Sequence, residues 1–387
     1  MQNLSQLIER GLQLSLFSQV WIALRFKDRA WRRSVPPRGS GWVRSLKIDR
    51  QDKLRTHPLP RGGTDCTPSL SRDHFARMLS THSYQRGPVM NLIRPAFAIL
   101  IFVFVITTNA QSPKVNDSLI VSTDWLAKHL NDDSLVLLQV GEKDEYAASH
   151  IPRAQFIQLA DISTPRGQGL TLELPAVDQL KNAFEKLGVS DNSRIVIYFG
   201  KDWVTPTARV FMTLDYLGFG NQTSILDGGF PAWRAEGKPV TSDVVEPKKG
   251  TLTPHANSKL VVDAVWVKEN LSNPNVRILD ARAPQFYSGA EQGRMPRGGH
   301  IPNARSIPYS TLVEDPTNKF KTPAALRQLF DAADVKPTSS VATYCHIGQQ
   351  ASLLYFVARY LGYDAHVYDG SFEDWSRHEG YPVATGQ

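Results

Sequence analysis

Two stretches of the chain show the same alternation of apolar runs and amphipathic segments. Short apolar runs, typical of buried strands, are separated by segments whose apolar residues recur at helical spacing. The first stretch contains strand 135–140, helix 177–189 and strand 194–199. The second contains strand 277–281, helix 323–335, strand 340–345, helix 351–362 and strand 365–370. This alternation predicts an α/β fold with mainly parallel sheets, helices on both faces, and sites at the C-terminal ends of strands.

The alternation belongs to an internal repeat. The segment SHIPRAQFIQLADIS at 149–163 recurs as GHIPNARSIPYSTLV at 299–313, about 150 residues later. Residues 214–240 recur in shorter form at 358–383. A repeat of this length is a whole domain rather than one unit of a solenoid.

The repeat sets the predicted domain boundaries. We expect one domain over 115–240 and a second over 258–385. The intervening residues 241–257 are polar and contain two prolines, so they are predicted to form a linker.

Composition places the repeated part among ordinary globular proteins. Of 387 residues, 41% are hydrophobic and 21% are charged, which is enough apolar material for a sizeable core. The formal charge of +7 arises in residues 1–89, which hold 16 of the 44 Lys and Arg but only 6 of the 37 Asp and Glu. The remainder carries 28 basic and 31 acidic residues, so we expect no nucleic-acid partner.

The N-terminal region contains a pattern typical of protein export. Residues 1–89 are arginine-rich and lack a sustained period. From Met90 the chain shows one early arginine, an apolar run at 96–106, and small residues ending at Ala110. This order predicts a signal peptide over 90–110 with cleavage after Ala110. The apolar run is short for a membrane span, which usually needs about 18 residues or more, so no stable membrane anchor is expected.

We therefore favour Met90 as the physiological start of an exported protein, with the bacterial periplasm as its location. In that interpretation residues 1–89 are a non-native or disordered basic extension. The alternative is a genuine basic extension followed by a weak membrane anchor.

Two cysteines in the whole chain exclude several classes of protein. Cys66 and Cys345 cannot build a disulfide framework or a multi-cysteine metal site, so no metal is expected. Cys345 lies where a predicted strand ends and shortly before a predicted helix that begins near Ala351. It is either an inert buried thiol or a nucleophile presented by the loop.

The chemistry of this loop favours the nucleophile. Backbone N–H groups of 346–351 can surround the sulfur, with the positive end of the helix dipole behind them. Gly348 allows a tight turn, and His346 could add a donor or a positive charge. Such surroundings are expected to lower the pKa of the Cys345 thiol from about 8.5.

Five motifs, taken in their order along the chain, resemble a known family. They are SHIPRA at 149–154, LDAR at 279–282, GHIPNA at 299–304, YCHIGQQAS at 344–352 and YDGSFEDW at 368–375. With them the chain, over about 115–385, resembles the tandem-domain sulfurtransferases of the rhodanese family, of the thiosulfate or 3-mercaptopyruvate type. The resemblance implies two rhodanese-like domains and a reaction without metal or organic cofactor.

The reaction that the resemblance implies runs through a persulfide. The Cys345 thiolate attacks the outer sulfur of a small anionic donor, thiosulfate or 3-mercaptopyruvate, and a thiol or cyanide then removes that sulfur. A thioredoxin-like protein is one candidate acceptor, and the enzyme is expected to be a monomer. The donor stays open, because the loop residues His346, Gly348, Gln349 and Gln350 match neither the basic loop of thiosulfate-preferring members nor the Gly-Ser-Gly loop of mercaptopyruvate-preferring ones.

The resemblance also implies anion-binding arginines. Arg282 in LDAR corresponds to the family arginine that reaches the donor, although a salt bridge to Asp280 is the plain alternative. Arg294 or Arg297 is a second candidate, against an exposed loop charge. His300 is expected to fix its loop by a hydrogen bond rather than to act in catalysis.

The first domain is predicted to be inactive. When the two halves are aligned, Phe199 stands at the position of Cys345, Gln139 at that of Asp280, and Gly141 at that of Arg282. This domain would then supply packing area and one wall of a cleft between the domains.

Two other functions use a cysteine at such a position. A phosphatase of the dual-specificity type needs an arginine six residues after the cysteine, where this chain has Ala351. A non-enzymatic persulfide carrier or redox-sensing module is the remaining alternative, and turnover of the donor would distinguish it from an enzyme.

Overall fold

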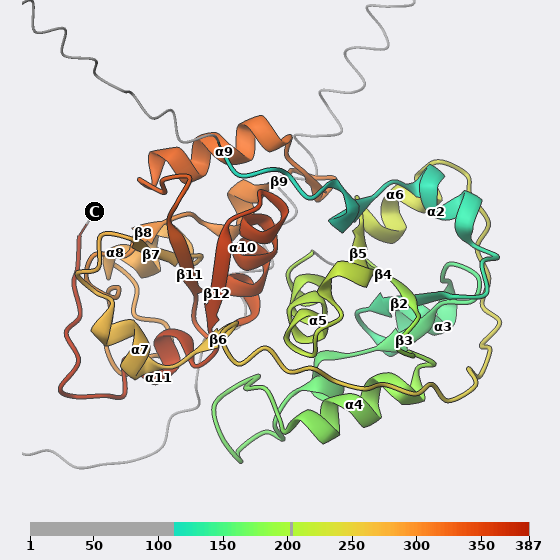
Figure 1. Ribbon diagram of the computed structural model, residues 1–387, viewed down its shortest axis with the longest axis horizontal. Coiled ribbons are helices and arrows are strands. Elements are labelled where there is room, and N and C mark those ends of the chain that lie inside the picture. The colour runs from blue at the N-terminus through green and yellow to red at the C-terminus, as the bar shows by residue number, and fades with distance from the viewer. Residues whose placement is uncertain (1–111, 202–203, 387) are drawn as a thin grey trace, which may run out of the picture. The chain divides into compact units, whose positions relative to one another are not determined.

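The computed structural model describes residues 112–201 and 204–386 (Figure 1). The predictions for residues 1–89 and for a signal peptide at 90–110 concern residues outside this part. Within the described residues, no helix is both long enough and apolar enough to span a bilayer.

The first half forms a five-stranded parallel sheet with the strand order β1-β5-β4-β2-β3. The strands are β1 (Ile120–Val121), β2 (Leu135–Val140), β3 (Gln155–Ile157), β4 (Arg194–Phe199) and β5 (Thr223–Leu226). The helices that flank it are α2 (Thr123–His129), α3 (Lys143–Ala148), α4 (Val177–Lys186), α5 (Thr205–Tyr216) and α6 (Gly229–Ala235).

The second half repeats this topology with the strand order β6-β12-β11-β7-β8. Its strands are β6 (Val261–Val262), β7 (Val276–Asp280), β8 (Arg305–Ser306), β11 (Ser340–Tyr344) and β12 (Asp364–Tyr368). Its helices are α7 (Ala264–Glu269), α8 (Pro284–Ser288), α9 (Pro323–Ala332), α10 (Gln349–Tyr360) and α11 (Ser371–Trp375). A separate antiparallel hairpin joins β9 (Val313–Glu314) to β10 (Lys319–Phe320). The predicted α/β fold of two parallel-sheet domains is confirmed.

Local sequence explains where several helices begin and end. Ser122 caps α2 by accepting a hydrogen bond from the Trp125 N–H at 3.1 Å, and Asp263 caps α7 in the same way. Helix α4 ends at Lys186, three residues before the predicted end, because Gly188 turns the chain with a φ of +84°. Helix α10 begins at Gln349, two residues before the predicted start.

The two sheets have the same register at the positions that matter for the chemistry. Gln139 pairs with Tyr198 in the first half, as Asp280 pairs with Tyr344 in the second. Each tyrosine hydroxyl accepts a backbone N–H at 3.1 Å, from Ile151 and Ile301 respectively. The residue after each tyrosine is therefore equivalent, so Phe199 occupies the place of Cys345, as predicted.

A second residue beside this position also differs between the two halves. Ser371 lies beside Cys345, with the Cys345 N–H 3.2 Å from its hydroxyl, and its equivalent in the first half is Gly229. Both residues have positive φ, +53° and +54°. A Cβ atom at Gly229 would lie 2.8 Å from the ring of Phe199, so the larger aromatic side chain requires the glycine. The two halves thus hold matched pairs, Phe with Gly and Cys with Ser.

Helices α5 and α10 pack against each other and join the halves. Equivalent positions face one another at both ends of the pair: Gln349 Nε2 donates to Thr205 Oγ1 at 3.1 Å, and Arg359 Nε lies 2.9 Å from Asp215 Oδ2. Contact of like positions at both ends means that the helices run parallel, so their N-termini lie together. The core follows this seam, where Phe211 meets Phe356 edge to face at 4.7 Å.

Candidate active site

Cys345 is held by the turn that follows β12. Its side chain is buried, 1% exposed, between the end of β11 and the start of α10. Its carbonyl accepts the Phe372 N–H at 2.9 Å, and the His346 carbonyl accepts the Glu373 N–H at 2.9 Å. The loop is therefore fixed at its first two residues by residues 368–375.

Burial dominates the acidity of the Cys345 thiol. Removal from water raises the pKa of Cys345 above its ordinary value, while the backbone N–H groups of four loop residues oppose this rise. Those groups belong to Ile347, Gly348, Gln350 and Ala351. The predicted amide cradle is confirmed, but the predicted net lowering is wrong, because desolvation of the sulfur outweighs the hydrogen bonds.

His346 does not bring a positive charge to the loop at neutral pH. Burial, followed by the nearby Arg282 cation, lowers the pKa of His346 to about 4, and weaker contributions from Asp280 and Gln350 raise it. The ring packs edge-on against Phe286 at 4.6 Å between centroids. Of the two roles considered for this side chain, only that of a neutral donor is compatible with this pKa near pH 7.

These pKa shifts predict the pH dependence of Cys345 alkylation. The rate of iodoacetamide reaction at the Cys345 peptide, measured by mass spectrometry, is expected to rise through the alkaline range, because the thiolate forms only above the raised pKa. The variant His346→Asn should show the same midpoint, since this histidine is already neutral between pH 6 and 9. A rate plateau reached below pH 7 would contradict the raised pKa.

Arg282 is held in a buried ion pair. Its Nη2 lies 2.6 Å from Asp280 Oδ2 and 2.7 Å from the Gly299 carbonyl, and the side chain is 1% exposed. Although burial by itself lowers the pKa of Arg282, Asp280 raises it to a net value above normal, and a Cys345 thiolate adds to the rise. The guanidinium also lies 4.2 Å from the Phe372 ring centroid. Its positive charge therefore favours a Cys345 thiolate, whereas direct contact with a substrate stays a prediction.

The two loop arginines have different surroundings. The guanidinium of Arg297 donates to the backbone carbonyls of Trp375, Ser376, His378 and Tyr381 at 2.7 to 3.0 Å, so it ties the C-terminal segment to the loop.

Arg294 is exposed, and no hydrogen bond or ion pair joins it to another described residue. It follows Gly293, where a Cβ atom would lie 4.0 Å from His346 Nε2, so this loop borders the Cys345 loop. Of the two candidates, Arg294 is the one that is free to meet an anion.

His300 has the contacts of a structural residue. Its Nδ1 lies 2.8 Å from the Tyr287 carbonyl, and its ring stacks on that of Tyr287 at 3.9 Å. Its backbone exchanges hydrogen bonds with Ala384 in both directions.

A small pocket of about 130 Å³ opens at Cys345, and we call it the Cys345 pocket. Its walls are Thr205, Cys345, His346, Ile347, Gln349 and Gln350. Because Thr205 and Gln349 begin α5 and α10, the pocket lies at the N-termini of two parallel helices, where partial positive charges favour an anion.

An ion pair between the halves, Arg209 with Asp369, packs against the Cys345 loop. Arg209 of α5 is fully buried, and its Nη1 lies 2.5 Å from Asp369 Oδ1. A Cβ atom at Gly348, whose φ is +87°, would lie 2.9 Å from the same Nη1, so the loop rests directly on the guanidinium. The Leu174 N–H also donates to Asp369, at 2.9 Å.

Sequence reasoning did not point to Thr205 or Arg209, and it singled out Asp369 and Ser371 only as members of the YDGSFEDW motif. Thr205 and Arg209 lie on a helix of the half predicted to be inactive, and only the packing of α5 on α10 brings them to the Cys345 loop. The repeat contained one usable indication, since Thr205 and Gln349 are equivalent positions in the two halves.

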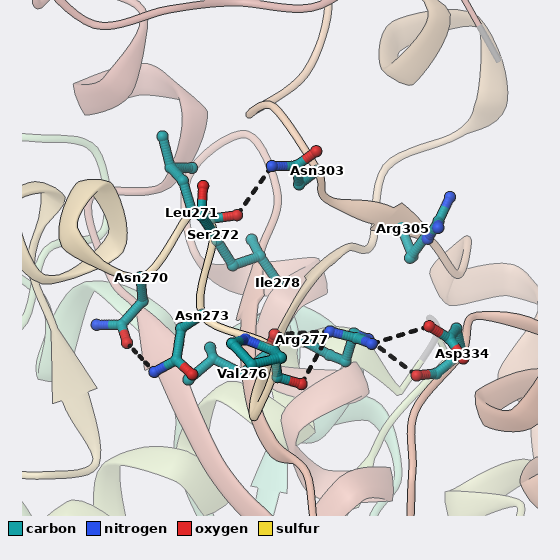
Figure 2. Close-up of a pocket in the computed structure, with 11 residues that line it drawn as sticks. Asn270, Leu271, Ser272, Asn273, Val276, Arg277, Ile278, Asn303, Arg305 and Asp334 are labelled. Atoms are coloured by element: carbon teal, nitrogen blue, oxygen red, sulfur yellow. Dashed lines mark hydrogen bonds and ion pairs between the residues drawn. The ribbon is translucent and has the colours of Figure 1, made fainter.

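A larger cavity of about 270 Å³ lies elsewhere, at the N-terminal end of β7 (Figure 2). Arg277 points toward Asp334 there, with 2.8 Å between Nη2 and Oδ2, and the Asn303 amide donates to the Leu271 carbonyl. Cys345 follows the C-terminal end of the neighbouring strand β11, so this cavity is at the opposite edge of the sheet. Within the described residues, no group of three or more His, Cys, Asp or Glu side chains could hold a metal ion.

Comparison with known proteins agrees with the two-domain geometry. The model of the rhodanese-like domain matches twice, at residues 122–236 and 263–378. The chain is a member of the rhodanese-like family. Each match covers four of the five strands of one sheet, and the second contains Cys345, Arg282 and the turn that holds the loop.

Relatives of this rhodanese-like protein align over about two thirds of its length. It is 30% identical over 285 residues to the "Sulfur carrier protein TtuD" of Thermus thermophilus, covering 69% of this chain and 97% of that one. It is 31% identical to a "Putative thiosulfate sulfurtransferase" of Synechococcus elongatus, covering 69% and 85% of the two chains. It is 29% identical to "Thiosulfate/3-mercaptopyruvate sulfurtransferase 1, mitochondrial" of Arabidopsis thaliana, covering 68% and 77%. Among solved structures, YnjE matches with a TM-score of 0.63 at 23% identity, covering 70% of this chain and 68% of that one, which supports the fold.

Proposed function

We propose that this rhodanese-like protein moves a sulfane sulfur from a small anionic donor to a thiophilic acceptor through a persulfide on Cys345. The observation that carries the proposal is the position of this cysteine. It lies in a cradle of four backbone N–H groups, at the N-termini of two helices and within reach of the Arg282 charge. Relatives named thiosulfate or 3-mercaptopyruvate sulfurtransferases, at about 30% identity over most of the chain, support the coarser statement that the protein is a sulfurtransferase.

In the first step the Cys345 thiolate attacks the outer sulfur of the donor. With thiosulfate, a bond forms between the two sulfurs, the sulfur–sulfur bond of the donor breaks, and sulfite leaves with the bonding electron pair. With 3-mercaptopyruvate, the carbon–sulfur bond breaks, and the thiol proton is transferred to carbon to give pyruvate. The backbone N–H groups around Cys345 stabilise the negative charge on the thiolate and on the persulfide that replaces it.

In the second step the thiolate of an acceptor, or cyanide, attacks the outer persulfide sulfur. The bond between that sulfur and Cys345 breaks, and Cys345 regains its electron pair as a thiolate. No external oxidant or reductant is needed, because the sulfur atom moves between two nucleophiles.

The Cys345 pocket suits a compact anionic donor. Its volume of about 130 Å³ lies below the size of sites that hold drug-sized ligands, about 300 Å³ or more. The two helix N-termini and the exposed Arg294 on the bordering loop both favour negative charge. Thiosulfate and 3-mercaptopyruvate both meet these requirements, so the size and charge of the pocket favour neither donor over the other.

Single-turnover kinetics test the proposal. Mixing the full chain with excess thiosulfate or 3-mercaptopyruvate, without acceptor, is expected to release about one equivalent of sulfite or pyruvate. The Cys345 peptide should then carry the mass of one additional sulfur atom. Absence of both the burst and the added mass with either donor would refute the proposal.

A persulfide carrier is the second candidate function. It is supported by the full burial of Cys345 and by the name of one relative, a sulfur carrier protein. Stable persulfide formation, followed by negligible turnover with cyanide or small thiols, would favour the carrier over the enzyme.

A further inference from the structure

A third cavity, of about 400 Å³, adjoins the Cys345 pocket, and we call it the Thr205 cavity. The two spaces share Thr205 as a common wall. Helix α10 lines both as well, with Gln349 on the Cys345 pocket and Leu353, one helical turn later, on the Thr205 cavity. The remaining walls of the cavity are Val204, Tyr309, Ser310, Val313, Glu314, Asp315 and Asn318.

The two spaces differ in size and in charge. The Thr205 cavity has a volume in the range of sites for organic ligands, while the Cys345 pocket does not. Val204, Val313 and Leu353 give the cavity an aliphatic wall. Its carboxylates, Glu314 and Asp315, are exposed, and neither forms an ion pair or a side-chain hydrogen bond with another described residue. The Cys345 pocket instead has the positive ends of two helices.

We propose that the Thr205 cavity binds the sulfur acceptor, and that it favours thiols with a neutral or cationic group over thiols with a carboxylate. This inference rests on the proposed sulfur transfer. The acceptor body would lie against the aliphatic wall, with its polar end toward Glu314 and Asp315. Its thiolate would pass Thr205 to attack the outer sulfur of the Cys345 persulfide, which breaks the sulfur–sulfur bond and returns the Cys345 thiolate.

Three matched thiols test this preference. Cysteamine, 2-mercaptoethanol and 3-mercaptopropionate share a two-carbon chain between the thiol and an amine, a hydroxyl or a carboxylate. The full chain is loaded with thiosulfate, freed of excess donor, and mixed with each thiol, and the rate of persulfide loss is divided by the thiolate concentration. We expect cysteamine to react about fivefold faster than 3-mercaptopropionate at low salt, with 2-mercaptoethanol between them, and the ratio to shrink at high salt.

Charge removal at the cavity should abolish the preference. In the double variant Glu314→Gln/Asp315→Asn the ratio of rates is expected to approach one, while the sulfite burst keeps its rate. The double variant Asp132→Asn/Asp133→Asn is a matched control, because it removes the same net charge from two exposed neighbours on the turn before β2. It should keep the parent ratio. Equal ratios in the parent and the Glu314/Asp315 variant would overturn the inference.

Filling the cavity gives a second, steric test. Val313→Trp places a large side chain in the cavity and should slow all three thiols, while cyanide, which is small enough for the Cys345 pocket, keeps its rate. Unchanged thiol rates would overturn the inference. The donor burst is measured first: its absence in the parent protein with both thiosulfate and 3-mercaptopyruvate refutes sulfur transfer itself, whereas a normal burst with charge-independent acceptor rates refutes the cavity alone.

Discussion

Replacement of Cys345 by serine is expected to abolish sulfur transfer and leave the fold intact. A hydroxyl has no accessible oxyanion near neutral pH and cannot form a persulfide, so turnover should fall on the order of 10⁴-fold or more. The hydroxyl is slightly smaller than the thiol, and its surroundings already satisfy the Cys345 backbone through Ser371 and Phe372. Sulfite or pyruvate release measures the first effect, and urea unfolding monitored by circular dichroism measures the second.

The second cysteine of the chain supplies the control. Cys66 lies outside the matched domains, so the Cys66→Ser variant should retain full turnover. Turnover that persists in Cys345→Ser would show that the sulfur is carried elsewhere, and the persulfide mechanism would then be abandoned.

Replacement of Arg209 by methionine is expected to lower the free energy of unfolding by about 3–5 kcal/mol, because it leaves a buried carboxylate without its cation. Asp369 would keep only the Leu174 N–H among its described partners. The same change should slow persulfide formation, since Gly348 rests on the lost guanidinium and the amide cradle of Cys345 passes through Gly348. Urea unfolding and the rate of the sulfite burst measure the two effects.

A second ion pair between the halves provides a control, because its loss should affect the overall stability but not the Cys345 loop. Arg359→Met breaks the pair with Asp215 at the other end of the two helices, about 15 Å along α10 from Gln349. It should destabilise the protein less, because the Arg359 side chain is 30% exposed, and should leave the burst rate unchanged. The conservative variant Arg209→Lys should recover part of the burst rate. If Arg209→Met shows a normal burst rate under conditions where it is folded, Arg209 is a stabilising residue only.

The longer strands β2, β4, β7, β11 and β12 were predictable because burial leaves a nearly continuous apolar run, whereas the other, shorter strands were not predicted. Residues 135–140 and 194–199 are such runs, and they coincide with β2 and β4. The start of α10 was harder to predict from the sequence, because Gly348 adopts a left-handed conformation and lets the helix begin at Gln349. Turn geometry of this kind depends on what the loop packs against, which here is Arg209.

The acidity of Cys345 and the walls of its pocket could not be read from the sequence. The loop residues do supply the expected N–H groups, but the sign of the pKa shift depends on how completely the fold removes the sulfur from water. Thr205 comes from the other half of the chain, 140 residues before Cys345, and no local pattern connects the two. Long-range packing decides both properties.

The matched pairs at the ends of β4 and β11 restrict how this protein can change. Phe199→Cys alone would leave a void where a buried ring now packs, and Gly229→Ser alone would force a Cβ atom to within 2.8 Å of that ring. Each single step toward a second reactive loop passes through a less stable protein, and Gln139 and Gly141 would still lack the ion pair that Asp280 and Arg282 form. In terms of accessible mutational paths, no single substitution gives the first domain a reactive cysteine loop, so new activity is more readily gained by altering the loop that carries Cys345.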